Sequence, residues 1–122
     1  MAGLSHDVLR FIGSSFRSVW ALELLLLLKR EPRVWLRDEL VTAMRASELV
    51  VTNALDTLVA AGLASVDGPG VRYAPVNDQV AGYVVKVEGI YAVRPDAVRR
   101  AIISSMSSGA SAFSDAFKLR RD

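Results

Sequence analysis

The sequence has 122 residues, of which 52% are apolar and 23% charged, so it predicts about one folded domain with a hydrophobic core. It contains no cysteine, which excludes disulfide bonds and thiolate metal sites, and its formal net charge is only +2. The longest apolar run, residues 19–28, is shorter than the roughly 20 residues of a membrane span, and the N-terminus lacks a signal-peptide pattern. We therefore expect a soluble cytoplasmic protein.

Two helices are predicted in the first 30 residues. Ser5 is a candidate N-cap for a short leading helix over residues 5–16, which residues 13–15 should break or bend because they read Gly-Ser-Ser. Residues 17–30 have the strongest helix pattern, since they are rich in leucine and their apolar side chains surround the helix axis. We expect this helix to be central, with another element or another subunit over its second face.

A short β-prone segment, residues 33–36, follows the central helix, and we expect it to pair with a hairpin further along the chain. Its tryptophan, Trp35, could pack in the core, support the hairpin or serve as a surface anchor, and core packing is the expectation. Residues 38–45 have a short helix pattern that stops at Ala46 and Ser47. Ser47 is a good N-cap for a second helix, because its hydroxyl can accept a hydrogen bond from an unpaired amide in the first turn.

The second helix should end at Gly62, which reaches a left-handed conformation without a Cβ penalty. Two alternating segments follow, residues 63–66 and 71–73, and the Asp-Gly-Pro-Gly turn between them predicts a β-hairpin. The sequence therefore predicts a mainly α fold with a small β-hairpin. Nine side chains are predicted to be buried together in its core: Trp20, Leu24, Leu27, Leu40, Met44, Val51, Leu55, Leu58 and Leu63.

Further helices are predicted after the hairpin. Asn77 is a candidate N-cap for one helix, and Pro95 lies near the first position of the next. A Ser-Ser-Gly stretch then predicts a hinge before an amphipathic, basic tail. We divide the chain into a core with its leading helix (residues 1–76), C-terminal helices (residues 77–106), and the hinge and tail (residues 107–122).

The middle of the chain has a packing pattern made up of Ser47, Val51, Leu55, Leu58, the Gly62-Leu63 pair and the glycines at 68 and 70. With the order helix, tight turn, helix, hairpin over residues 17–76, it resembles the winged helix-turn-helix superfamily of bacterial regulators, including the multiple-antibiotic-resistance-type branch. The whole chain is also similar to small proteobacterial winged-helix proteins with a Phe-x-x-Ala-Phe-x-x-Arg-like tail, here Phe113, Ala116, Phe117 and Arg120. The resemblance implies a DNA-binding transcriptional regulator that can dimerise through helices outside the reading motif.

In such a protein the second helix enters a DNA groove, and the hairpin, called the wing, touches the DNA backbone. Asn53 can pair with adenine, and Thr52 can contact a phosphate or a thymine methyl group. The predicted DNA-binding residues are Arg33, Arg37, Arg45, Ser47, Thr52, Asn53 and Arg72.

The charge pattern opposes this interpretation. Residues 46–93 carry two basic and five acidic residues, a net charge of −3, and no lysine or arginine lies between Arg45 and Arg72. A surface that binds DNA should be basic instead. The alternative is a winged helix that serves as a protein-interaction or scaffold module, with little or no DNA binding.

Apolar residues in the C-terminal part predict protein contacts. One helix should carry an apolar stripe, and two phenylalanines four residues apart follow the hinge. We expect a homodimer built from residues 78–106, with the tail docked across the dimer or onto another protein; the alternative is a monomer whose tail folds back onto its own subunit. The predicted partner-binding residues are Val84, Val87, Tyr91, Phe113 and Phe117.

No catalytic site, metal or cofactor is predicted. His6 is the only histidine and has no partner at metal-ligand spacing. The glycines at 68 and 70 belong to a turn and not to a phosphate loop, because no Gly-Lys-Ser/Thr follows them. We therefore expect that the protein is not an enzyme.

Overall fold

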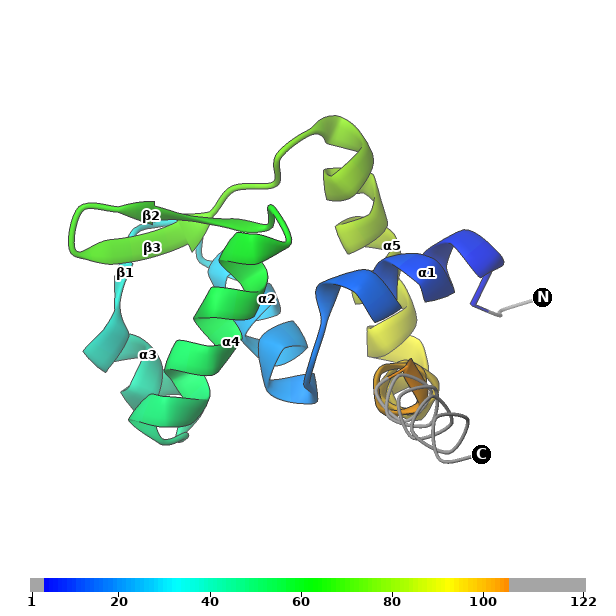
Figure 1. The fold of residues 1–122 in the computed structure, drawn as a ribbon, viewed down its shortest axis with the longest axis horizontal. Coiled ribbons are helices and arrows are strands. Elements are labelled where there is room, and N and C mark those ends of the chain that lie inside the picture. Colours follow the sequence, from blue (N-terminus) through cyan, green and yellow to red (C-terminus); the bar gives the residue numbers. More distant parts are fainter. Residues whose placement is uncertain (1–3, 106–122) are drawn as a thin grey trace, which may run out of the picture.

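The computed structural model describes residues 4–105, which form α-helices and one small antiparallel sheet. This agrees with the predicted mainly α fold that contains a small β-hairpin. Helix α2 (Val19–Arg30) lies at the centre, and the other elements lie on two sides of it (Figure 1). On one side are α3 (Arg37–Met44), α4 (Glu48–Ala60) and the sheet, and on the other are α1 (His6–Ser15), α5 (Asp78–Val93) and a helical segment over residues 95–105.

Polar side chains cap the starts of α1, α2, α4 and α5. Each cap accepts a hydrogen bond from the backbone N–H three residues further along, and the caps are Ser5, Ser18, Ser47 and Asn77. The helix starts predicted at Ser5, Ser47 and Asn77 are thus confirmed. The predicted end of α4 is also confirmed, because Gly62 has a φ of +74°, in the left-handed region that strains other residues.

Helix α1 runs without interruption from His6 to Ser15, so the break or bend predicted at residues 13–15 is wrong. Gly13 serves close packing instead. A Cβ atom at this position would lie only 2.8 Å from Ser105 Oγ. The glycine therefore lets the segment of residues 95–105 approach α1 closely, and it does not end the helix.

Helix α2 is buried on most sides, as its apolar sequence predicts. Its buried residues are Ala21, Leu22, Leu24, Leu25, Leu26 and Leu28. On the side of the sheet, α2 packs against α4 and against strand β3 (Gly70–Tyr73). The side chains of α2 thereby hold α4 and the sheet in one core.

Polar contacts join α2 to α5 on its opposite side. Lys29 Nζ donates a hydrogen bond of 2.7 Å to Glu88 Oε1, and the Tyr91 hydroxyl donates a hydrogen bond to the Glu23 carboxylate. Burial, together with the bond to Glu23, raises the pKa of Tyr91, so its hydroxyl keeps the proton that it donates. The second face of α2 is thus covered by elements of the same chain.

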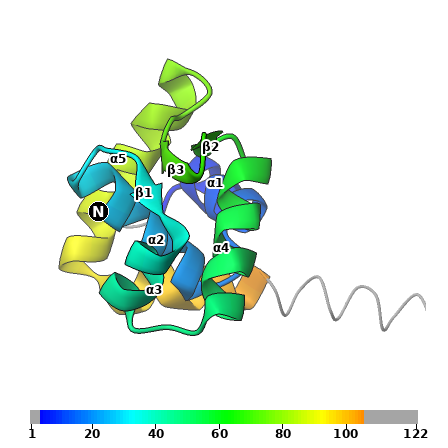
Figure 2. The same cartoon turned by 90° about the vertical axis from the view of Figure 1, so that its left-hand side faces the viewer.

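Strands β1 (Trp35–Leu36), β2 (Ala64–Asp67) and β3 form an antiparallel sheet in the order β1-β3-β2. Trp35 lies opposite Val71 of β3, which confirms that the segment after α2 pairs with the hairpin. In Figure 2 the hairpin of β2 and β3 lies at the C-terminal end of α4, and α3 lies near the N-terminal end. The sheet and α3 therefore flank α4 at its two ends.

The predicted core is mostly confirmed. Six of the nine predicted side chains are buried: Leu24, Leu40, Val51, Leu55, Leu58 and Leu63. Two more, Leu27 and Met44, are partly buried against the same core. The placement of Trp20 is wrong, because its side chain is 43% exposed. Trp20 lies on the one face of α2 that is not fully buried, together with Glu23, Leu27 and Arg30 at helical spacing, and the charged Glu23 and Arg30 could have indicated this. Trp35 is only 5% exposed, as predicted.

None of the helices in residues 4–105 is long and apolar enough to cross a membrane by itself. Together, α1 and α2 have sufficient length and apolar composition, but a bend of 97° separates them.

The core position of α4 can be tested with two identical substitutions on that helix. Leu58 is fully buried, so Leu58→Ala should lower the free energy of unfolding by about 2–5 kcal/mol. Leu49 is 69% exposed, and Leu49→Ala should change it by about 0.5 kcal/mol or less. Chemical denaturation measures both values. Equal losses in the two variants would contradict the orientation of α4.

Candidate contact surface of α4 and the hairpin

One face of α4 points away from the core. Five of its residues recur at helical spacing on this face and are exposed or half-buried: Glu48, Leu49, Thr52, Asn53 and Asp56. They comprise two carboxylates, one amide, one hydroxyl and one large apolar side chain. This face carries no cation, so any positive charge must come from the neighbouring elements.

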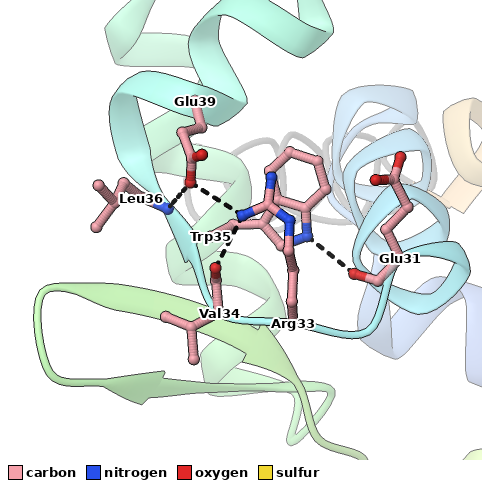
Figure 3. A network of polar contacts seen from close by, with 6 residues as sticks. All are labelled: Glu31, Arg33, Val34, Trp35, Leu36 and Glu39. Atoms are coloured by element: carbon pink, nitrogen blue, oxygen red, sulfur yellow. Dashed lines mark hydrogen bonds and ion pairs between the residues drawn. The ribbon is translucent and has the colours of Figure 1, made fainter.

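Arg33 is held in a network at the start of α3 (Figure 3). Its guanidinium carbon lies 3.6 Å from the centre of the Trp35 ring, and its Nη1 lies 3.1 Å from Glu39 Oε1. The same carboxylate oxygen accepts the Leu36 backbone N–H at 2.9 Å, which caps the helix. Trp35 Nε1 donates to the Glu31 carbonyl at 3.0 Å. These contacts give Arg33 a local role in fixing the β1–α3 connection.

Arg72 is also paired locally. Its Nε lies 3.5 Å from Asp67 Oδ2, and both side chains are about half exposed. The ion pair lies on one face of the hairpin, because Asp67 pairs with Gly70 and Arg72 pairs with Ser65 across the two strands. The positive charge of Arg72 is therefore balanced on the hairpin itself.

Arg37 and Arg45 differ from these two arginines. They lie at the two ends of α3, both are exposed, and neither has an ion-pair partner among residues 4–105. Arg45 adopts a φ of +54°, which ends α3 and begins the turn into α4. Of the predicted DNA-binding arginines, only these two remain available for an external anion.

A groove of about 240 Å³ lies between α4 and the hairpin. Polar and apolar atoms contribute about equally to its lining, which is formed by Trp35, Arg37, Leu55, Asp56, Val59, Val66, Gly68, Pro69, Gly70 and Val71. Val66 is 67% exposed and Val59 is 39% exposed. Only Arg37 and Asp56 bring charge to the groove, and no group of three potential metal ligands occurs within residues 4–105. The groove can therefore accept an apolar side chain beside a polar or charged one.

The other predicted DNA-binding residues lie at the start of α4. Ser47 is its N-cap, with its hydroxyl bonded to the Val50 N–H at 3.1 Å. Asn53 is exposed and Thr52 is half-buried on the outward face. Ser47 thus lies two residues after Arg45, and Thr52 and Asn53 lie further along α4, while Arg72 lies on β3 and Arg33 precedes β1.

The predicted partner-binding stripe on α5 lies inside the chain. Val84, Val87 and Tyr91 are buried in the common core, so they do not form an exposed surface for a second subunit. The helical periodicity is correct, but α1 and α2 of the same chain cover the stripe. The homodimer itself stays a prediction. Phe113 and Phe117 lie outside the described residues.

Sequence reasoning missed the apolar side chains that remain exposed around the groove. Val59 is 39% exposed and lines the groove, although its neighbour Leu58 is fully buried. Val66 is 67% exposed on the hairpin, at a position that usually carries a polar residue. Apolar residues at such positions are the signal that could have indicated this surface.

Comparisons of the chain with protein-family models, curated proteins and solved structures found no match.

The Glu39 contacts lead to a prediction about its titration. The Leu36 N–H bond first, and then the Arg33 bond, lower the pKa of the Glu39 carboxyl below its ordinary value. Since the pKa is lowered in the folded state, the stabilisation is present above the ordinary carboxyl pKa and is lost as the pH falls through the folded pKa. NMR titration of Arg33→Ala should give a Glu39 pKa that lies between the folded and ordinary values, because the Leu36 bond remains. An unchanged Glu39 pKa in this variant would contradict the network.

Proposed function

We propose that residues 17–76 form a winged helix-turn-helix that serves as a protein-interaction module. The order α2, β1, α3, α4, β2, β3 supports this fold assignment, since it is the order of that superfamily. Because winged helices serve several functions, the role has to be argued from the surface of α4 and the hairpin. The proposed partner is a protein segment with an apolar side chain next to a basic one.

The observation that carries the proposal is the charge of this surface. Glu48 and Asp56 stand on the outward face of α4, where a DNA-binding helix would meet phosphates. Arg33 and Arg72, which could offset them, are each engaged by a carboxylate of the same chain. A duplex would therefore meet carboxylates on the helix that should read it.

The groove between α4 and the hairpin is a second argument for a protein partner. Protein interfaces have cores that are depleted of charge and rich in apolar contacts. An apolar side chain placed between Val59 and Val66 would cover both of them and would rest on Leu55 and Trp35. A basic group beside it would lie near Asp56. This combination defines the chemistry of the proposed partner.

A random peptide library displayed on phage tests the proposal without knowledge of the natural partner. Peptides selected on the immobilised full chain should combine apolar residues with lysine or arginine. Val66→Asp should weaken their binding by about tenfold or more, equivalent to about 1.4 kcal/mol, because it places a carboxylate in the centre of the contact. Val66 is exposed, so this variant should fold.

Val85→Asp is the matched control, because Val85 is also exposed, at 57%, but lies on α5 away from the groove. This variant should bind the selected peptides as the unmodified chain does. Failure to enrich any peptide, or equal binding to the two variants, would remove the groove as the docking surface.

DNA binding by a homodimeric transcriptional regulator is the second candidate. It is favoured by Arg37 and Arg45, which are exposed and have no ion-pair partner in residues 4–105. Ser47, Thr52 and Asn53 would add neutral contacts from the first half of α4. With two available cations, such binding would be weak and strongly dependent on salt.

Fluorescence anisotropy with a labelled duplex at several salt concentrations distinguishes the two candidates. If DNA is bound, Arg37→Ala and Arg45→Ala should each reduce the salt slope by about one unit, because each removes a phosphate contact. Arg100→Ala, an exposed arginine of the segment 95–105, is the control and should leave the slope unchanged. The absence of binding at low salt would reject DNA binding and leave the protein-interaction proposal in place.

A further inference from the structure

A second cavity lies between the start of α2 and the end of α3, away from the groove described above. It has a volume of about 420 Å³ and is lined by Val19, Trp20, Glu23, Ala43 and Met44. We call it the Trp20 cavity. It is larger than the groove between α4 and the hairpin, and it lies within the size range of pockets that bind small ligands or side chains.

The exposure of Trp20 indicates that the Trp20 cavity is a contact site. Its side chain is 43% exposed, and its indole N–H has no hydrogen-bond partner within residues 4–105. Trp35, by contrast, is buried and donates its N–H to the Glu31 carbonyl. The Trp20 N–H is thus free to bond to water or to a partner, and exposed tryptophans beside a hollow are typical of contact sites.

The lining favours aromatic side chains next to a cation. The Trp20 ring can pair with another aromatic ring, and the Met44 sulfur makes favourable contacts with ring edges. Glu23 uses Oε2 to accept the Tyr91 hydroxyl, so Oε1 remains for a basic group. The chemistry of the cavity therefore suits an aromatic segment that continues into lysine or arginine.

The C-terminal sequence of this chain has that composition. Phe113 and Phe117 are four residues apart, and three basic residues follow, Lys118, Arg120 and Arg121. These residues lie beyond the described part of the chain. We propose that residues 113–121 dock into the Trp20 cavity of their own chain, with a phenylalanine ring on Trp20 and a basic group at Glu23.

The connection is long enough for this arrangement. The described chain ends at Ser105, beside Gly13 of α1, and Phe117 follows 12 residues later. An extended connection of that length spans up to about 40 Å. A domain of roughly 100 residues has a radius of gyration of about 13 Å, so this reach covers its diameter. A tethered segment also has a millimolar effective concentration, which favours its own chain over a second copy at micromolar concentration.

Disulfide trapping tests the proposal in the full chain, which has no cysteine of its own. The pair Ala43→Cys and Ala116→Cys should form an intrachain disulfide in high yield, because docking brings the two positions to within about 7 Å. The control pair Ala60→Cys and Ala116→Cys places the first cysteine on an exposed position of α4 outside the cavity, and its yield should be low. Equal yields in the two pairs, or a disulfide that joins two chains, would overturn same-chain docking.

Acrylamide quenching of tryptophan fluorescence provides a second test that needs no cysteine. Trp35 is buried, so Trp20 dominates the quenching. The double variant F113A/F117A leaves every described residue unchanged and should abolish the protection of Trp20 that the full chain has. Identical quenching of the full chain and the double variant would overturn the proposal.

Discussion

The burial of α2 is the constraint on which the rest of the structure depends. Its leucines surround the helix axis, so a stable fold must cover it from two sides. Helix α4 and β3 cover one side, while Lys29–Glu88 and Tyr91–Glu23 contacts hold α5 on the other. The apolar stripe of α5 is buried in this packing, so Val84 and Val87 are not exposed to a second subunit.

The same constraint decides which surfaces remain for function. Because α2 covers one side of α4, the acidic outward face and the groove beside the hairpin are left to solvent. The first turn of α2 also leaves a tryptophan, Trp20, partly exposed at the edge of the core. The arginines near α4 divide into two that stabilise the chain locally, Arg33 and Arg72, and two that are available, Arg37 and Arg45. Both proposals, for the groove and for the Trp20 cavity, thus start from what the core leaves uncovered.

Local signals in the sequence predicted most of the fold. Caps such as Ser47 and the terminator Gly62 act within a few residues, so the element order could be derived without tertiary information. The exposure of Trp20 was indicated locally, because Glu23 and Arg30 lie on the same face of α2. The close approach of Ser105 to Gly13 is a contact between distant segments, which a single sequence does not encode as a local pattern. The site was only partly predictable for the same reason. The acidic character of α4 was evident, whereas the engagement of Arg33 by Glu39 and of Arg72 by Asp67 required the structure.

Native-state amide hydrogen exchange tests most directly whether one core surrounds α2. If α4 and α5 pack on α2 in one core, opening any of these three helices disrupts that core. The slowest amides of all three should then exchange with the free energy of global unfolding. The comparison of residues 78–93 with residues 48–60 is decisive. Exchange of the α5 amides with a clearly lower free energy, while α4 stays protected, would show that the C-terminal helices form a separate unit and would contradict the account.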